Sequence, residues 1–494
     1  MKTVWVLGDQ LNRRIGALAA ETPASARILM VESSAMLSGR RFHRQRLHLV
    51  LTAMRRFAAE LNRSGFEVDY RQAAALAAGL REHRTDFSPD EVVATEPNSR
   101  SIAGLLERLD VRLVRSDQFL CHPDEFASWA GTRRRLRMED FYRWQRRRLG
   151  YLMDGDQPSG GAWNFDHENR LPPPAGGGDW VAPPRTRLDD VDRRVLEELT
   201  PDLPGAAPAG WWATSRRGAQ HRLRHFVDNV LPAFGPYEDA MTGTNWHLAH
   251  SMLSPYLNLG LLLPGEVCDA VESAFREGRV PINSAEGMIR QVIGWREFVW
   301  GIYWLWSDQF DANELNHFRD LPPAWTGEAA SSMRCVAEAL AGIDERGWLH
   351  HIQRLMILAN FANLFGVEPA QVRGWMRERF VDAADWVMGP NVMGMGMWAD
   401  GGRMSTKPYV SGGAYINRMS DYCGDCGFDP KQRTGPEACP FTTLYWDFLD
   451  RHREVLATNS RMARQYHTLD RLSDLDEVKR RAATVIEAVS AGQL

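Results

Sequence analysis

Four of the six cysteines stand in a pattern that constrains this chain more than any other feature of its 494 residues. Cys423 and Cys426 form a Cys-Gly-Asp-Cys hook, twelve residues separate Cys426 from Cys439, and Cys335 lies 88 residues before the hook. The N-terminal segment MKTVWVLGDQLNRRIG lacks the apolar run and cleavage site of a secretory signal. We therefore expect a cytoplasmic protein whose thiols bind a metal or cluster rather than form disulfides.

The cysteine spacing alone leaves two kinds of site open. Structural zinc sites with four cysteines usually contain two CxxC pairs. This chain has one pair and two single thiols, which is closer to the dispersed ligands of iron–sulfur clusters. Zinc remains the alternative on this evidence, whereas Cys121 and Cys268 have no such neighbours and are expected in the core.

Composition is that of a globular enzyme with two or more domains, at 44% hydrophobic and 25% charged residues. No run approaches the 18 apolar residues of a membrane span, so we expect no membrane partner. The net charge of -4 means that a polyanion would have to bind a local basic patch. We expect a monomer.

Residues 1–130 alternate short apolar runs with helical or polar stretches, which predicts an α/β domain with a Rossmann-like parallel sheet. Ligands bind beyond the carboxyl ends of such strands, so Gly8, Asp9 and Gln10 after the first strand and Glu32 after the second are candidate contacts. Ordinary loop polarity is the alternative. The expected strands are Thr3 to Leu7, Arg27 to Val31, Phe66 to Tyr70, Glu91 to Thr95 and Val111 to Val114, and a helix is expected over Gln45 to Arg63.

Residues 131–208 are expected to connect this domain to the next. Eight arginines fall between Arg133 and Arg148, interleaved with Phe141, Tyr142 and Trp144. Arginines neutralise phosphates and aromatic rings stack on bases, so this basic helix is a candidate nucleic-acid contact, together with arginines such as Arg216, Arg217 and Arg222. A solvated helix face with the same composition is the alternative.

Residues 209–494 are predicted to form an all-α domain, because 221–234, 286–306 and 350–365 carry helical apolar spacing. Within it the motifs HSMLSPYLNLGLLLPGEV, GWREF, HHIQR and FVDAADWVMGPN occur in that order. This succession resembles the flavin-binding half of the photolyase and cryptochrome family. The four cysteines narrow the resemblance to the iron–sulfur bacterial cryptochromes and photolyases, the prokaryotic (6-4) photolyase branch. The match extends to LGDQL, EDFYRW, GGAWNFD, KPYVSGGAYINRMSDYCGDCGFD and ACPFTTLYWDFL.

The resemblance implies three cofactors. They are FAD in the helical domain, a [4Fe-4S] cluster on the four cysteines Cys335, Cys423, Cys426 and Cys439, and a 6,7-dimethyl-8-ribityllumazine antenna in the first domain. The antenna contacts would be Gly8, Asp9, Gln10 and Glu32, although other pigments would use similar groups.

The implied FAD contacts begin at the HSMLSPYLNLG turn, where Ser251, Leu253 and Ser254 match a phosphate-binding helix start. Arg296 and Arg354 match arginines along the flavin ring. The remaining implied contacts are Asp382, which matches the carboxylate that pairs with Arg354, and Tyr237, His351 and Met388.

Two positions depart from the family pattern. Met388 matches the neighbour of flavin N5, where relatives carry Asn or an acidic residue, and a thioether does not hydrogen-bond N5 strongly. Met376 stands where this branch has a second aromatic residue in its electron-transfer route. Trp375 and Tyr415 are the remaining candidates, although a structural role is the ordinary one for any of the 18 tryptophans.

The lesion pocket is implied by a second set of matches. His350 and His351 are adjacent on a predicted helix and point about 100° apart, so at most one faces a given pocket. His351 matches the histidine that acts on the lesion, where an imidazole can donate a proton. A histidine without a catalytic role at a helix start is the alternative. Gln291, Tyr409 and Asp239 match further positions of the pocket.

Three functions follow. The first is a light-driven (6-4) photolyase, in which excited reduced FAD passes an electron to a flipped (6-4) photoproduct in UV-damaged DNA, with His351 as proton donor. The second is a cryptochrome-type blue-light photoreceptor with little or no repair, favoured by Met388 and Met376. The third is a zinc-stabilised DNA-binding protein without light chemistry. The sequence leaves open the choice between (6-4) and cyclobutane lesions, the antenna pigment and the purpose of the cluster.

Overall fold

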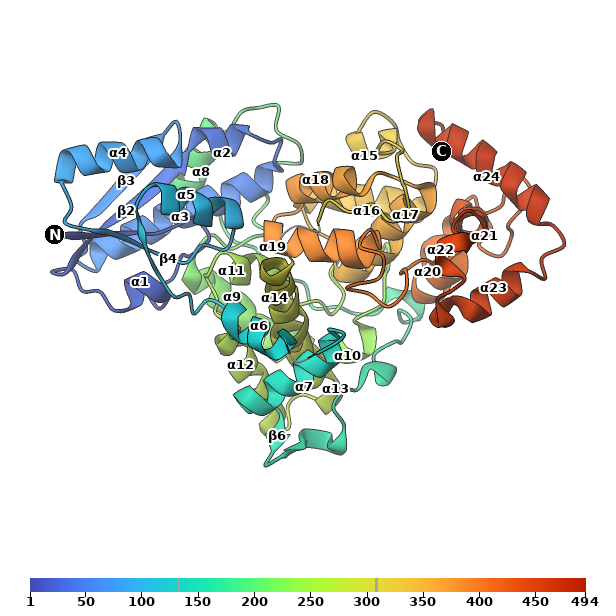
Figure 1. The fold of residues 1–494 in the computed structure, drawn as a ribbon, viewed down its shortest axis with the longest axis horizontal. Helices are drawn as coiled ribbons and strands as arrows, with labels where there is room; N and C mark the ends of the chain where they lie inside the picture. Colours follow the sequence, from blue (N-terminus) through green and yellow to red (C-terminus); the bar gives the residue numbers. More distant parts are fainter. Residues whose placement is uncertain (132, 307–309) are drawn as a thin grey trace.

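The computed structural model describes residues 1–131, 133–306 and 310–494. Figure 1 shows an α/β region that contains the N-terminus at one end, a helical centre, and the C-terminal helices at the opposite end. The expectation of an α/β domain followed by an all-α domain is confirmed. None of the helices among the described residues is long and apolar enough to cross a membrane.

All five strands expected in the first domain are present and form one parallel sheet in the order β3-β2-β1-β4-β5. In β1, Val4 packs on the side of α3 and Trp5 on the side of α4, as the period of two of a buried strand requires. One expectation was wrong, because β2 continues to Ser33 and Glu32 lies within it, not after it. The bounds are β1 Lys2–Trp5, β2 Ala26–Ser33, β3 Val68–Ala73, β4 Val92–Thr95 and β5 Arg112–Val114, with α1 Gly16–Ala19, α2 Ser34–Ser38, α3 Arg44–Arg63, α4 Leu76–Phe87 and α5 Arg100–Arg108.

The connector packs against both of its neighbours. Tyr142 on α7 donates to Glu286 of the helical domain at 2.8 Å. Asp189, the N-cap of α8, and Asp192 within α8 accept hydrogen bonds from Arg56 on α3 at 2.9 and 2.6 Å. The connector elements are α6 Pro123–Gly131, α7 Met138–Leu149, β6 Met153–Asp154, β7 Gln157–Pro158, η1 Ser159–Gly161, η2 Asp166–Glu168, η3 Ala175–Gly177 and α8 Asp190–Glu198.

The first part of the helical domain contains several stretches of π-helix. They are η4 Phe226–Val230, η5 Arg290–Arg296, η6 Gln353–Ala359 and η7 Gly389–Gly396. Such segments are rare and are frequent at functional sites. The α-helices around them are α9 Arg216–His225, α10 Leu231–Tyr237, α11 Ser254–Asn258, α12 Pro264–Arg276, α13 Ile282–Ile289, α14 Glu297–Leu305, α15 Pro323–Thr326, α16 Arg334–Arg346, α17 Asn360–Phe365, α18 Pro369–Arg379 and α19 Asp385–Met388.

The C-terminal part packs on this centre through one continuous core, which includes Phe361, Phe365, Phe441 and Phe448. Phe361 and Phe441 contact each other with ring centroids 5.3 Å apart. The elements are α20 Gly413–Met419, η8 Tyr422–Asp425, α21 Pro440–Arg451, α22 Arg453–Leu456, η9 Ser460–Met462, α23 Ala463–Leu469 and α24 Leu475–Ser490.

Candidate functional site

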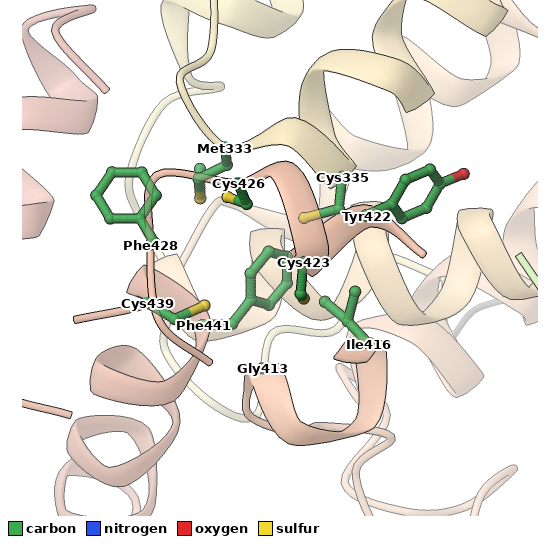
Figure 2. A pocket seen from close by; sticks show the side chains of 10 residues that line it. All are labelled: Met333, Cys335, Gly413, Ile416, Tyr422, Cys423, Cys426, Phe428, Cys439 and Phe441. Atoms are coloured by element: carbon green, nitrogen blue, oxygen red, sulfur yellow. The ribbon is translucent and has the colours of Figure 1, made fainter. Parts of the chain in front are cut away.

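The four cysteines of the sequence pattern line one pocket. Cys335 comes from the first turn of α16, Cys423 from η8, Cys426 from its C-terminal end and Cys439 from the residue before α21. Figure 2 shows the four side chains gathered around a common space that Met333, Ile416, Phe428 and Phe441 border. Four sulfur ligands in an apolar enclosure are the donor set of a cysteine-ligated metal or iron–sulfur centre.

The backbone around the pocket is shaped to admit the sulfur atoms. A Cβ on Gly413 would lie 2.9 Å from the Sγ of Cys439, so a side chain at this position would displace the thiol. Burial first, and then the neighbouring thiols Cys439 and Cys426, raise the pKa of the Cys423 thiol to about 12. Four thiolates can therefore share this space only with a cation between them.

Asp382 joins two of the expected flavin contacts. Arg354 donates to both of its carboxylate oxygens at 2.9 and 3.0 Å, and the Ser254 hydroxyl donates to Oδ2 at 2.6 Å. The Asp382 carbonyl oxygen accepts from Asn258 at 2.8 Å. The start of α11 and the start of η6 are thereby held to the segment that precedes α19.

The other expected FAD contacts lie at the end of α10, just before α11 and at the end of η5. Leu253 is the N-cap of α11, Ser251 Oγ accepts from the Leu253 N–H at 3.4 Å, and Tyr237 ends α10. Arg296 pairs through Nη1 with Glu297 at 2.8 Å and lies 4.0 Å above the Phe119 ring, while its Nε and Nη2 are buried without a hydrogen-bond partner among the described residues. A buried guanidinium with free donors suits an anionic ligand, so these residues fit FAD.

The two methionines that depart from the family pattern are both buried. Met388 is 4% exposed at the end of α19, and Met376 is 4% exposed on α18. Trp375 donates its indole N–H to the carbonyl oxygen of Trp325 at 2.9 Å, and the two rings lie 4.7 Å apart. Trp325 is therefore an aromatic neighbour of Trp375 that the sequence did not reveal.

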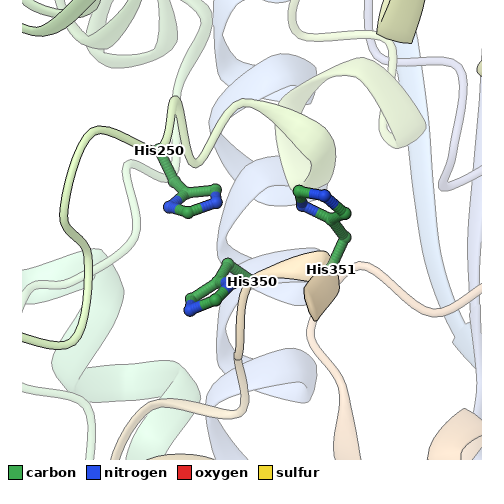
Figure 3. Close-up of side chains that lie close together, drawn as sticks. All are labelled: His250, His350 and His351. Atoms are coloured by element: carbon green, nitrogen blue, oxygen red, sulfur yellow. The ribbon is translucent and has the colours of Figure 1, made fainter. Parts of the chain in front are cut away.

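Three histidines cluster at the start of η6 (Figure 3). One ring nitrogen from each of His250, His350 and His351 lies within 4.8 Å of the others. The rings of His250 and His350 are stacked at 4.2 Å and nearly parallel, at 17°. Their in-plane lone pairs run side by side and do not converge on one ion, so the cluster suits proton sharing better than metal binding.

Burial distinguishes the two adjacent histidines. His350 is 2% exposed, and burial holds its pKa well below the usual value, so that it stays neutral. The His351 side chain is 48% exposed and its Nε2 lies 3.6 Å from Asp239 Oδ1. Of these two histidines, only His351 is therefore open to a ligand that arrives from solvent.

The remaining lesion-pocket candidates are Asp239, Tyr409 and Gln291, and the charge of Asp239 also acts on the electron-transfer candidate Tyr415. Burial and then the Asp239 charge raise the pKa of Tyr415, whose ring lies 5.5 Å from the Arg418 guanidinium. Tyr409 is 37% exposed, and burial and then the charge of Asp166 raise its pKa. Gln291 is half-buried on η5. No contact recorded for the described residues joins Gln291 to His351.

The antenna candidates do not form one hydrogen-bonded group. Gly8 and Asp9 form the turn after β1, and burial raises the pKa of Asp9 to about 6. Gln10 donates to the Glu96 carbonyl oxygen at 2.8 Å, and its own side-chain oxygen is buried without a partner among the described residues. Glu32 on β2 accepts hydrogen bonds from three other side chains, those of Arg55, Tyr70 and Gln72.

Most of the arginine-rich segment does not form a free basic face. Arg146 is fully buried and donates to the carbonyl oxygens of Tyr151 and Trp163. Arg222 is buried against the Trp211 carbonyl oxygen, and Arg216 pairs with Glu266. The expectation that Arg216 and Arg222 bind DNA phosphates was wrong, because both side chains already bind partners inside the fold.

Other cations remain exposed, except for the half-buried Lys407. Among the described residues, no ion pair involves Arg134, Arg135 and Arg137 before α7 or Lys407, Arg418 and Arg461 near Tyr409 and Tyr415. The last group includes Arg461, whose charge acts on Tyr409. Two separate basic areas thus remain, and one of them adjoins the candidate lesion pocket.

A hydrogen bond connects the cysteine pocket to the histidine cluster. Gln353, two residues after His351, donates to the Tyr422 hydroxyl at 2.9 Å, and Tyr422 lines the cysteine pocket beside Cys423. Met241 N–H also donates to the Met419 carbonyl oxygen at 2.9 Å. No sequence signal marks Tyr422 or Gln353, because their pairing spans 69 residues.

Comparisons with known proteins found relatives of this chain. Residues 4–212 match a family model described as deoxyribodipyrimidine photo-lyase-related protein. The chain is 42% identical over 490 residues to a (6-4) photolyase of Agrobacterium fabrum, which covers 95% of this chain and 96% of that protein. An uncharacterized protein of Acanthamoeba polyphaga mimivirus is 36% identical over 94 residues, 19% of this chain and 69% of that protein.

The fold has a solved counterpart. A bacterial class III photolyase from Agrobacterium tumefaciens, determined as a crystal structure, superposes with a TM-score of 0.58 at 16% identity and covers 99% of this chain and 98% of its own. The resemblance drawn from the ordered motifs is confirmed by the near full-length relative. The chain belongs to the photolyase family.

Proposed function

We propose that this photolyase is a light-driven (6-4) DNA repair enzyme. The observation that carries the proposal is the 42% identity, over nearly the whole of both chains, to a protein named (6-4) photolyase, combined with an exposed His351 beside Asp239. In photolyases FAD, once reduced and excited by blue light, supplies the electron for repair. Asp382 would hold Arg354 and Ser254 in place for this cofactor, and the unpartnered donors of Arg296 would face its anionic part.

His351 would donate the proton that the lesion needs. An imidazole is suited to this task near neutral pH, and His351 is the exposed member of its cluster. Tyr409, Asp239 and Gln291 would line the pocket into which the damaged base flips. Lys407, Arg418 and Arg461 would contact the phosphates around the flipped base, so affinity for damaged DNA should fall as salt rises.

The four cysteines would hold a [4Fe-4S] cluster, because one apolar pocket collects all four sulfur atoms. The antenna would be 6,7-dimethyl-8-ribityllumazine, supported by the polar turn at Gly8 and Asp9 and by the free oxygen of Gln10. Absorbance spectra of the chromophores released from the purified protein test the antenna. A pigment other than a lumazine would contradict that assignment.

One experiment tests the function. The reduced protein is illuminated with an oligonucleotide that contains one (6-4) photoproduct, and the restored thymines are counted against a cyclobutane dimer substrate. We expect restoration of the (6-4) lesion. No turnover with FAD fully bound would favour the blue-light photoreceptor, the function that Met388 and Met376 support.

A further inference from the structure

The guanidinium group of Arg296 is buried, yet two of its three nitrogens have no protein partner. Nη1 donates to Glu297 Oε1 at 2.8 Å, whereas no hydrogen bond from the described part of the chain reaches Nε or Nη2. The Arg296 side chain is 8% exposed and that of Glu297 is fully buried. Unpaired donors on a buried cation cost free energy, so we expect a ligand to accept hydrogen bonds from these two nitrogens.

The other arginine of η5, Arg290, lacks this free capacity. Its Nη2 donates to Asp166 Oδ1 at 2.7 Å and lies 3.6 Å from Glu238 Oε1. Its Nε lies 3.9 Å from Glu286 Oε1. Three carboxyl groups thus surround the charge of Arg290. Arg296 has one carboxylate partner within the described ranges, so of these two arginines it is the one suited to an anionic ligand.

Glu297 fixes two parts of the structure that encloses Arg296. While Oε1 binds the guanidinium, Oε2 accepts from the Cys121 N–H at 2.9 Å. Cys121 lies two residues after Phe119, whose ring centroid is 4.0 Å from the guanidinium carbon of Arg296. The ring of Trp386 lies 5.3 Å from the same carbon. A single carboxylate therefore holds both the cation and the chain segment whose aromatic ring covers it.

The hydrogen bonds of Glu297 are those of an ionised carboxylate. Burial raises its pKa to about 7, and Arg296 and the Cys121 N–H oppose the rise. Both oxygens accept from N–H donors, and a proton on either oxygen would weaken one of these bonds. The charges of Glu297 and Arg296 offset each other, so the pair costs less to bury than the guanidinium alone.

We propose that Glu297 is a positioning residue of the flavin site, an inference that rests on the proposed function and its FAD cofactor. Glu297 occupies Nη1 and Phe119 covers one face of the guanidinium. The edge with Nε and Nη2 stays open, and such an edge can bind two acceptor atoms of one anionic group. Glu297 thus acts through Arg296, which it holds ready for the anionic part of FAD.

A double-mutant cycle on FAD affinity tests this role. Each holoprotein is diluted in the dark without DNA, and the fluorescence of released FAD gives the dissociation constant. Glu297→Gln, which keeps the shape but not the charge, should weaken FAD binding about tenfold, and Arg296→Gln at least as much. Because Glu297 acts through Arg296, the double variant should bind FAD as Arg296→Gln does. Additive losses, or an unchanged affinity in either single variant, would overturn the proposal.

The matched control is Asp192→Asn. Asp192 is also fully buried, and it accepts from an arginine, Arg56, at 2.6 Å and from a backbone N–H, that of Asp189, at 2.9 Å. In urea unfolding both Glu297→Gln and Asp192→Asn should lose stability, but Asp192→Asn should keep the FAD affinity of the wild type. An equal loss of FAD affinity in the control would show that Glu297 has only a structural role.

Phe119→Leu tests the same enclosure with the carboxylate intact, should Glu297→Gln fail to fold. Removal of the ring over Arg296 should weaken FAD binding in the wild-type background and have no effect in the Arg296→Gln background. Equal effects in both backgrounds would refute the proposal. These measurements use neither light nor a lesion. A wild type that binds FAD but repairs no lesion would therefore contradict the repair function alone, while the cycle would still decide the role of Glu297.

Discussion

Asp382 accepts hydrogen bonds from both Arg354 and Ser254, which come from different helices of the flavin-binding region. The carboxylate is 6% exposed and the Arg354 side chain 19%. Since removal of one partner leaves the other charge buried and unpaired, this pair is sensitive to single substitutions.

Asp382→Ala should therefore lose bound flavin and about 3 kcal/mol of unfolding free energy. Flavin per chain is measured by absorbance and stability by urea unfolding. Asp311→Asn, which alters an exposed carboxylate paired with Arg373, is the control and should keep both. Full flavin content in Asp382→Ala would show that this pair does not organise the cofactor site.

Cys439→Ser should lose iron, because each of the four thiolates is a cluster ligand under the proposed function. We expect about four irons per chain in the wild type, which also excludes the zinc alternative. Gly413→Ala keeps all four thiols but places a Cβ 2.9 Å from Cys439 Sγ, so its iron content should also fall. Cys268→Ala removes a buried cysteine outside the pocket and should retain its iron.

Trp375→Phe should slow the photoreduction of FAD, because Trp375 is the tryptophan candidate for electron transfer. Trp375 on α18, next to Met376, forms an aromatic pair with Trp325 on α15. The rate is followed by flavin absorbance under blue light with a thiol as the external reductant. Trp144→Phe, on α7, should leave the rate unchanged. An unaltered rate in Trp375→Phe would show that electrons reach FAD through other residues.

Met388→Asn should lengthen the lifetime of the photoreduced flavin in air and darkness. An amide oxygen can accept a hydrogen bond from N5–H of the reduced ring, whereas the thioether of Met388 is a weak acceptor. The decay of the reduced-flavin spectrum is compared with that of Met376→Leu, a buried methionine variant on α18. Equal decay in the wild type and Met388→Asn would place Met388 away from N5.

Acid should destabilise the protein through His317 and His452, whose Nε2 atoms lie 3.2 Å apart. Burial lowers the pKa of His317 to about 3 and that of His452 to about 4. An unfolded histidine titrates near 6.5, so the stability is complete above that pH and is lost as pH falls toward these folded values. At about pH 5 the loss from His317 is about 2 kcal/mol.

The check is urea unfolding at about pH 7.5 and about pH 5. A double variant, His317→Asn with His452→Gln, should lose less unfolding free energy between the two conditions than the wild type. Parallel losses in both proteins would assign the acid sensitivity to other buried histidines, such as His43 and His250.

Local sequence pattern predicted the sheet because each strand alternates between two buried faces, as Val4 and Trp5 do. It could not predict the partners of Glu32, which come from α3 and β3. Arg146 and Arg222 looked like surface cations for the same reason, since the carbonyl groups that bind them become close only in the folded chain.

The sequence likewise predicted some residues of the candidate site and missed others. Cysteine spacing predicted that four thiols would meet, and the ordered motifs named His351, Arg354 and Asp382. Glu238 escaped notice because a lone glutamate beside an aspartate has no distinctive spacing. Its burial beside Arg290 and against the bare backbone of Gly287 follows from tertiary packing.

The hydrogen bond from Gln353 to Tyr422 has a practical consequence for photochemical measurements. It ties the wall of the cysteine pocket to the helix that carries His351 and Arg354. Preparations that have lost iron should therefore give low repair quantum yields even when every chain contains flavin. Quantum yields from different purifications become comparable only when each is accompanied by an iron determination.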